Sequence, residues 1–176
     1  MAIRVISPVN LDEGHLVALT ADGKMDETKA VIGGQVVKLV ESTEAAYGGE
    51  PHIEASKKAD TIATAFPYGF VYKASKAEPA NNLYIPFNQY KAPLNRQSVI
   101  LTKGFRAELW NDGTGKVFED NVFNAKPGTP LYVSETGTLT TAADGTATNV
   151  GSMVVAVVEI APANKDTGVL TIQAVI

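Results

Sequence analysis

Apolar residues in this chain come in short runs separated by glycine and polar turns, and this pattern constrains the fold more than any other feature. Such runs lack the length and period of amphipathic helices and are typical of strands joined by tight turns. Segments 15–20 and 130–134 each lead into a glycine-containing turn and then another apolar residue, which indicates two hairpins. We therefore predict a mainly β protein, a small β-barrel or β-sandwich built from strand-turn-strand units.

Two segments could be read as helices instead of strands. Residues 54–65 are the best helix candidate, but three closely spaced β-branched residues lower their helix propensity, so coil or strand is equally acceptable there. The longest apolar run, residues 153–158, is far shorter than the roughly 20 residues of a membrane-spanning helix. We expect this run to be a buried strand, and we expect no membrane partner.

The two ends of the chain resemble each other. Residues 13–25 align without a gap on residues 127–139 and keep two glycines in register. Downstream, GGQVVKLVE at 33–41 aligns on GSMVVAVVE at 151–159, with five of nine positions identical. An internal duplication and a chance match between glycine- and valine-rich strands both explain this similarity. Two duplicated half-units could close one barrel or form two small ones, because closure removes exposed sheet edges.

Charge divides the chain into three parts. Lysine plus arginine and aspartate plus glutamate number four and eight in residues 1–50, eight and four in 51–110, and three and seven in 111–176. We therefore predict an N-terminal β unit at 1–50, a basic, aromatic-rich insertion or arm at 51–96, and a C-terminal β-barrel unit at 97–176. One composite domain is the alternative to separate units.

Seven of the thirteen aromatic residues lie in the predicted insertion at 51–96. A strand over residues 66–72 would place its four aromatics on one face, and Pro67 and Gly69 favour an edge strand or arm. This face either fills the protein's own core or, together with basic side chains, contacts a partner. The candidate partner-binding residues are Phe66, Tyr68, Phe70, Tyr72, Lys73, Tyr84, Phe87, Tyr90 and Arg96.

Signals for catalysis or metal binding are weak. The chain has no cysteine, and His15 and His52 are its only histidines, without a G-x-S-x-G motif beside them. Residues 112–116 lack the spacing of a phosphate-binding loop, and the acidic residues of 22–27 lack the pattern of a calcium loop. We expect no enzyme, no catalytic residue, no cofactor and no metal.

The net charge of −4 provides no basic footprint for a polyanion, so we expect no nucleic-acid partner. At the N-terminus, Pro8 and Asp12 interrupt the apolar residues before they reach the length of a signal peptide. We therefore expect synthesis in a cytoplasm.

The C-terminal segments PGTPLYVSETGTLT and VGSMVVAVVEIAPANKDTGVLTIQAVI contain a glycine-led strand and turn, a long strand opened by Gly151, and a last strand after Thr167 and Gly168. Together with the Ala-, Gly-, Thr- and Val-rich composition, these segments resemble the decoration, or cement, proteins of tailed-bacteriophage heads. The resemblance covers 127–176 best and 11–41 more loosely. It is a pattern without an invariant motif, so it carries over no defined site residue.

The resemblance implies a structural virion protein, made in the bacterial host cytoplasm, that binds the outside of a phage head. As a homotrimer it would bridge subunits of the major capsid protein and stabilise the mature capsid. Binding the mature lattice alone would shift the equilibrium against opening of the shell, and trivalent contact would add avidity.

Two alternatives come from other classes of protein. A carbohydrate- or receptor-binding β-module of a phage tail or surface appendage would use exposed aromatic rings and would be present in few copies per particle. A small hydrolase or isomerase on a β-barrel would require His15 or His52 in a cleft beside a carboxylate.

Overall fold

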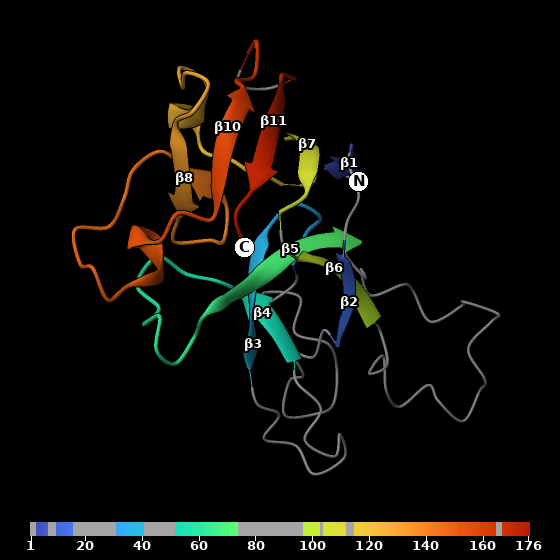
Figure 1. Ribbon diagram of the computed structural model, residues 1–176, viewed down its shortest axis with the longest axis vertical. Helices are drawn as coiled ribbons and strands as arrows, with labels where there is room; N and C mark the ends of the chain where they lie inside the picture. The colour runs from blue at the N-terminus through green and yellow to red at the C-terminus, as the bar shows by residue number, and fades with distance from the viewer. Residues whose placement is uncertain are drawn as a thin grey trace, which may run out of the picture.

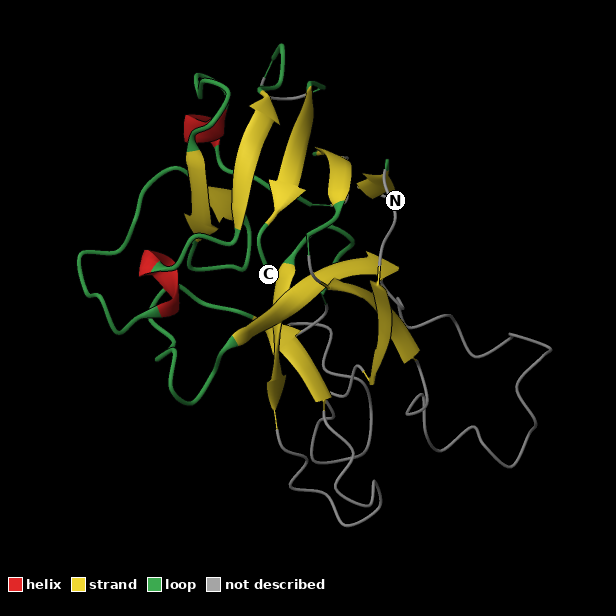
Figure 2. Ribbon diagram, in the orientation of Figure 1, coloured by secondary structure: helices red, strands yellow, loops and turns green. Residues whose placement is uncertain are grey.

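The computed structural model describes residues 3–6, 10–15, 31–40, 52–73, 97–102, 104–111, 115–164 and 167–176. For residues 10–15, 52, 73 and 97–99, only the backbone is described. Strands dominate these residues, with two short 3-10 helices, η5 (Asp120–Val122) and η6 (Val150–Ser152) (Figure 2). The predicted mainly β fold is confirmed.

Six strands form an antiparallel sheet with the order β1-β7-β11-β10-β8-β9. This six-stranded sheet joins the N-terminal strand to the C-terminal half of the chain and occupies the upper part of Figure 1. Its strands are β1 (Ile3–Val5), β7 (Arg106–Trp110), β8 (Pro130–Val133), β9 (Leu139–Thr140), β10 (Ala156–Ile160) and β11 (Val169–Ala174).

The other five strands follow one another around a ring in the order β2-β4-β3-β5-β6. They are β2 (Asn10–His15), β3 (Val36–Val40), β4 (His52–Ala55), β5 (Pro67–Lys73) and β6 (Gln97–Thr102). Four of the five seams are antiparallel ladders. The fifth, between β2 and β4, is a single parallel pair, His15 with His52. The ring is therefore closed at one residue pair only, and elsewhere behaves as a curved sheet.

A large core lies between the ring and the six-stranded sheet. Alternation along the sheet puts residues such as Leu109 and Ile172 on its inner face, where the ring contributes Val36, Phe70 and Leu101 to the same buried cluster. A second, smaller cluster fills the ring itself and contains Val31, Val37, Ile53, Val71 and Ile100. Two layers packed over one core give the sandwich-like architecture.

The helix candidate at 54–65 is not a helix: residues 54–55 are the end of β4, and residues 57–65 form hydrogen-bonded turns. Asp60 N–H donates to Lys57 O at 3.0 Å, and Ala65 N–H donates to Thr61 O at 2.9 Å. The turns lie against the loop before η6, where Ile62 N–H donates to Thr148 O at 2.9 Å (Figure 1). These contacts to a distant loop override the weak helix propensity of the segment.

The C-terminal hairpin follows the sequence closely. The strand expected at 130–134 is β8, and Gly137 turns into β9 with a φ of 79°. The apolar run 153–158 contributes to β10, which begins at Ala156. Of the hairpin expected at 15–25, only His15 lies within the described residues.

The three-part division along the chain does not appear as three spatial units in the described residues. β4 and β5, both within 51–96, are integral strands of the ring, and β1 pairs with β7 in the six-stranded sheet. The two similar segments also separate: β3 lies in the ring and β10 in the sheet. The first block of the N-terminal repeat lies mostly outside the described residues.

Candidate contact surface

β5 carries the first part of the predicted contact segment, and it is an interior strand. It pairs with β3 on one side and β6 on the other, so the expectation of an edge strand or arm is wrong for residues 67–73. Glycine suits position 69 because β5 and β6 approach closely there. A Cβ at this position would lie 2.5 Å from Leu101 O. The glycine that suggested an edge strand instead permits tight packing against β6.

The four aromatics of this segment do not share one face, which corrects the prediction. The register of β5 shifts against β3 around Tyr68 and against β6 around Tyr72, so each tyrosine is an extra residue on β5. Such a bulge breaks the two-residue alternation of a strand. Tyr68 consequently packs against the ring cluster, whereas Phe70 belongs to the larger core and the half-buried Tyr72 packs against that core.

Phe70 is a core residue, and its assignment to a partner surface is wrong. Its side chain is fully buried, and its ring meets that of Phe105 at a centroid distance of 5.4 Å and an interplanar angle of 87°. This edge-to-face contact joins β5 of the five-stranded ring to the segment that leads into β7. The core alternative weighed from the sequence therefore holds for Phe70.

Among the candidates whose side chains the structure describes, Phe66 is the exposed one, with 55% of its surface accessible. It precedes β5 and follows the turns of residues 57–65, which are anchored through Val150 N–H to Asp60 O at 2.7 Å and Gly151 N–H to Lys58 O at 3.0 Å. The aromatic ring is therefore presented on a hydrogen-bonded support. Of Lys73 only the backbone is described, and Tyr84, Phe87, Tyr90 and Arg96 lie outside the described residues.

A shielded ion pair holds this support to the ring. Lys38 Nζ on β3 lies 2.9 Å from Asp60 Oδ1, and the two side chains are only 12% and 15% exposed. The other carboxylate oxygen of Asp60 accepts the N–H of Lys57 at 2.7 Å. The pair therefore fixes the turn before Phe66, and the sequence offered no signal for it because the partners belong to different strands and turns.

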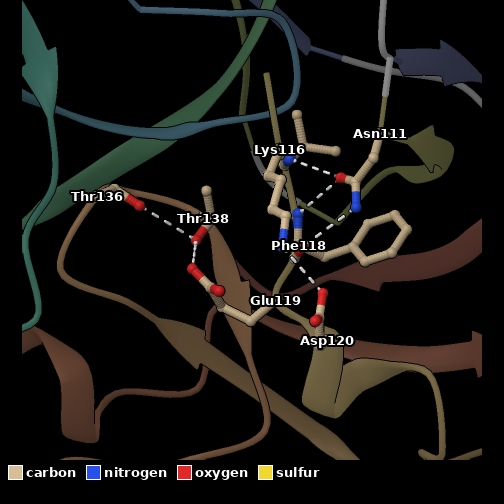
Figure 3. Close-up of polar contacts among 8 residues, drawn as sticks. Asn111, Lys116, Phe118, Glu119, Asp120, Thr136 and Thr138 are labelled. Atoms are coloured by element: carbon tan, nitrogen blue, oxygen red, sulfur yellow. Dashed lines mark hydrogen bonds and ion pairs between the residues drawn. The ribbon is translucent and has the colours of Figure 1, made fainter. Parts of the chain in front are cut away.

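A cluster of hydroxyls surrounds Glu119 at the hairpin of β8 and β9. Thr138 Oγ1 donates to Glu119 Oε1 at 2.7 Å, and Ser134 Oγ lies 2.5 Å from Thr138 Oγ1. Figure 3 shows Thr136 joined to Thr138, which contacts Glu119. The carboxylate therefore accepts from a buried threonine, and the hydroxyls are engaged with one another, so this arrangement serves to hold the hairpin.

Beside this cluster, the side chain of Asn111 substitutes for strand pairing. Its Oδ1 accepts the N–H of Val117 at 2.8 Å, and its Nδ2 donates to Phe118 O at 3.3 Å (Figure 3). Lys116 and Asp120 form an ion pair at 3.0 Å with both side chains 59% exposed. These contacts orient the chain that places Phe118 in the large core.

The outward side of the six-stranded sheet carries paired charges. Arg4 on β1 pairs with Glu108 on β7, and Arg106 forms three hydrogen bonds of 2.6 to 2.9 Å with the carboxylate of Glu159 on β10. These hydrogen bonds, and the attraction of the carboxylate, raise the pKa of Arg106 above its ordinary value. The guanidinium and carboxylate neutralise each other and leave little net charge for a charged ligand.

The two histidines come together in the backbone pairing of β2 and β4. Sequence reasoning considered each histidine singly and missed this pairing. Among the side chains that the structure describes, no three His, Cys, Asp or Glu gather in a metal-binding arrangement. No helix in the described part of the chain has the length and hydropathy to cross a membrane.

No protein-family model matches the chain, and no curated protein sequence matches it.

Proposed function

We propose that this chain is a structural virion protein that binds the outside of a phage head and bridges subunits of the major capsid protein. The observation that carries the proposal is the exposed ring of Phe66 on a firmly anchored support. An aromatic side chain that is already ordered loses little conformational entropy on binding, and aromatic residues are common binding hot spots.

The architecture also suits a binding role. The described carboxylates of Glu119, Asp60 and Glu159 are engaged in contacts that hold the fold. Two layers over one large core make a stiff body that can transmit load between the shell subunits it touches. A homotrimer would multiply one modest contact by avidity.

Sedimentation tests the location on the particle. A lysate from the phage that encodes the gene is separated on a gradient, and the polypeptide is quantified across the fractions. We expect co-migration with DNA-filled heads in near-stoichiometric amounts to the shell protein. A few copies per particle would favour the appendage module, and a polypeptide confined to the soluble fraction would contradict the proposal.

A matched pair of variants tests the contact surface. Phe66→Ala should weaken binding of the purified protein to undecorated heads by about tenfold, which corresponds to roughly 1.4 kcal/mol. Ile160→Ala, which truncates a 61% exposed side chain on the six-stranded sheet, is the control and should bind as the parent does. Equal affinity of the parent and Phe66→Ala for the heads would show that Phe66 is not part of the contact surface. Phe70→Ala is unsuitable because it alters the core.

A further inference from the structure

Four of the five exposed large apolar side chains in the described part of the chain belong to the six-stranded sheet. They are Ile6, Ile160, Val169 and Val175, and their exposed fractions run from 41% for Val169 to 61% for Ile160. Phe66, in front of β5, is the fifth. Single exposed apolar residues are normal on a protein surface, whereas several on one element mark a contact surface.

The pairing of β7 with β11 fixes which side chains of the sheet point away from the core. Leu109 and Leu170 are paired and buried, so alternation puts their neighbours Trp110 and Val169 on the outer face. At the other end of β11, alternation past the last buried residue puts Val175 on the same face. Apolar side chains therefore lie at both ends of the central strand.

The flanking strands extend this outer face. Ile6 N–H donates to Arg106 O at 2.9 Å, which places Ile6 beside the outward-facing Arg106. On the other side of β11, Ile160 pairs with Thr171, which alternates with two buried residues of the core. The exposed apolar side chains therefore share one face that reaches from the end of β1 to β10.

The charged side chains of this face neutralise one another within the chain. The six strands contain four charged residues, which form the ion pairs Arg4–Glu108 and Arg106–Glu159. The strands therefore carry no net charge, although the whole chain has a net charge of −4. Two copies of the chain that approach by this face avoid the repulsion between their acidic parts.

This charge pattern favours a second copy of the chain over a partner of different charge. A face without net charge gives no electrostatic attraction to an acidic or a basic partner. A two-fold axis brings the same patch of two copies together, and an arginine of one copy can then approach a glutamate of the other. We propose that the outer face of the six-stranded sheet is a self-association surface, on which two copies of the chain pack sheet against sheet.

The size of the face sets the strength of the contact. The five strands from β1 to β8, about 4.8 Å apart and about five residues long, cover roughly 24 Å by 17 Å. A face of this size is too small for an obligate dimer, so we expect a reversible pair with a dissociation constant in the micromolar range. The half-buried Trp110 supplies an aromatic anchor of the kind that dominates such contacts.

The inference is independent of the proposed virion role, because the surface that it concerns is separate from the one around Phe66. Sedimentation velocity of the purified full chain, at protein concentrations from about 1 µM to 1 mM, tests it. We expect the molar mass to double with concentration, from one chain to two or, for a trimer, from three chains to six.

A matched pair of charge substitutions locates the contact. Val169→Asp places an unpaired carboxylate on the face of both copies and should weaken the pairing at least about thirtyfold. Phe66→Asp introduces the same charge at a similarly exposed apolar position outside the face, and it should pair as the parent does. Ile160→Ala keeps an apolar side chain and should weaken the pairing by about threefold or less, so it remains a valid control for binding to heads.

Circular dichroism checks that each variant is folded, and Ile160→Asp takes the place of Val169→Asp if the latter is not. A parent whose molar mass is constant over the whole concentration range would overturn the proposal. So would equal association of Val169→Asp and the parent. A trimer that neither dilution nor Val169→Asp changes would exclude this face as the contact and leave the homotrimer of the proposed function intact.

Discussion

The six-stranded sheet and the five-stranded ring solve the same problem of burying apolar side chains in different ways. Among the described residues, a cluster of twenty buried side chains lies between the sheet, the facing strands of the ring and the segments that connect them. Inside the ring, the cluster among the described residues contains five. The ring covers one face of the sheet. The ring itself must curve around its own small cluster of side chains, and its β2–β4 seam is closed by one residue pair. We therefore expect the stability of the ring to depend mainly on the large core beside it, and the stability of the sheet to depend little on the cluster inside the ring.

A matched pair of isoleucines measures this difference most directly. Ile172→Ala on β11 opens a cavity in the large core and should destabilise the protein by about 3–5 kcal/mol, because rigid neighbours cannot refill it. Ile100→Ala on β6 removes the same atoms from the ring cluster and should cost about 2 kcal/mol, because a smaller cluster collapses more easily. Urea denaturation of both variants gives the two values.

Equal losses for the two isoleucine variants would show that the ring interior is packed as rigidly as the large core. A larger loss for Ile100→Ala would reverse the comparison.

The hairpin turn at Gly137 tests the joint between the two regions. Its φ of 79° is unfavourable for other residues, and a Cβ there would lie 3.1 Å from Ala55 Cβ on β4 and 3.1 Å from Val36 O on β3. Gly137→Ala should therefore cost about 2–4 kcal/mol, combining backbone strain with overpacking against the ring. Thermal denaturation followed by circular dichroism measures the loss.

Gly128 provides the control for this prediction. Its φ is 87°, but no atom lies within 4 Å of an added Cβ, so Gly128→Ala should cost only the strain of about 1 kcal/mol. If the two alanine variants are equally stable, contact between the hairpin and the ring contributes nothing at this position.

The ion pair of Lys38 and Asp60 connects the ring to the turns before Phe66. Asp60→Ala removes the ion pair and the hydrogen bond from Lys57 N–H, and it should cost about 1–2 kcal/mol, below the 3–5 kcal/mol typical of a fully buried pair. Asp120→Ala, which breaks the exposed pair with Lys116, should cost about 0.5 kcal/mol or less. Chemical denaturation of both variants at low and high salt measures the two losses.

High salt should reduce the contribution of the exposed pair and leave that of the shielded pair largely intact. Similar, salt-sensitive losses for both variants would contradict the shielding of Asp60.

These contrasts also show which features of the fold could be predicted from the sequence. Glycine-punctuated runs correctly predicted the β class, and the turn chemistry of residues 136–137 correctly predicted the β8–β9 hairpin, because both depend on local backbone preferences. The faces of β5 were not predictable, because the bulges at Tyr68 and Tyr72 arise from pairing with two other strands. Nothing in the sequence separated Phe66, which is exposed, from Phe70, which is buried.

The smallest expected effect concerns Asp144, in the loop that supports the turns of residues 57–65. The N–H of Thr146 donates to its carboxylate at 2.9 Å, and Asn149 Nδ2 donates at 3.3 Å. These bonds, with the charge of Lys58, hold the pKa of Asp144 below its ordinary value. Because the folded pKa is lower than the unfolded one, the contribution to stability is complete above about pH 4 and is lost as the pH falls through the folded pKa.

Asp144→Asn should therefore make the urea midpoint less dependent on pH between 5 and 2 than it is in the parent. Asn149→Ala, which removes one of the two donors, should give an intermediate slope. The effect is small because the carboxylate is in contact with solvent, so the comparison requires several closely spaced pH values. Identical pH profiles for the parent and Asp144→Asn would show that the Asp144 carboxylate contributes nothing measurable to stability. The loop would then be held to the turns of residues 57–65 by backbone bonds such as Val150 N–H to Asp60 O at 2.7 Å.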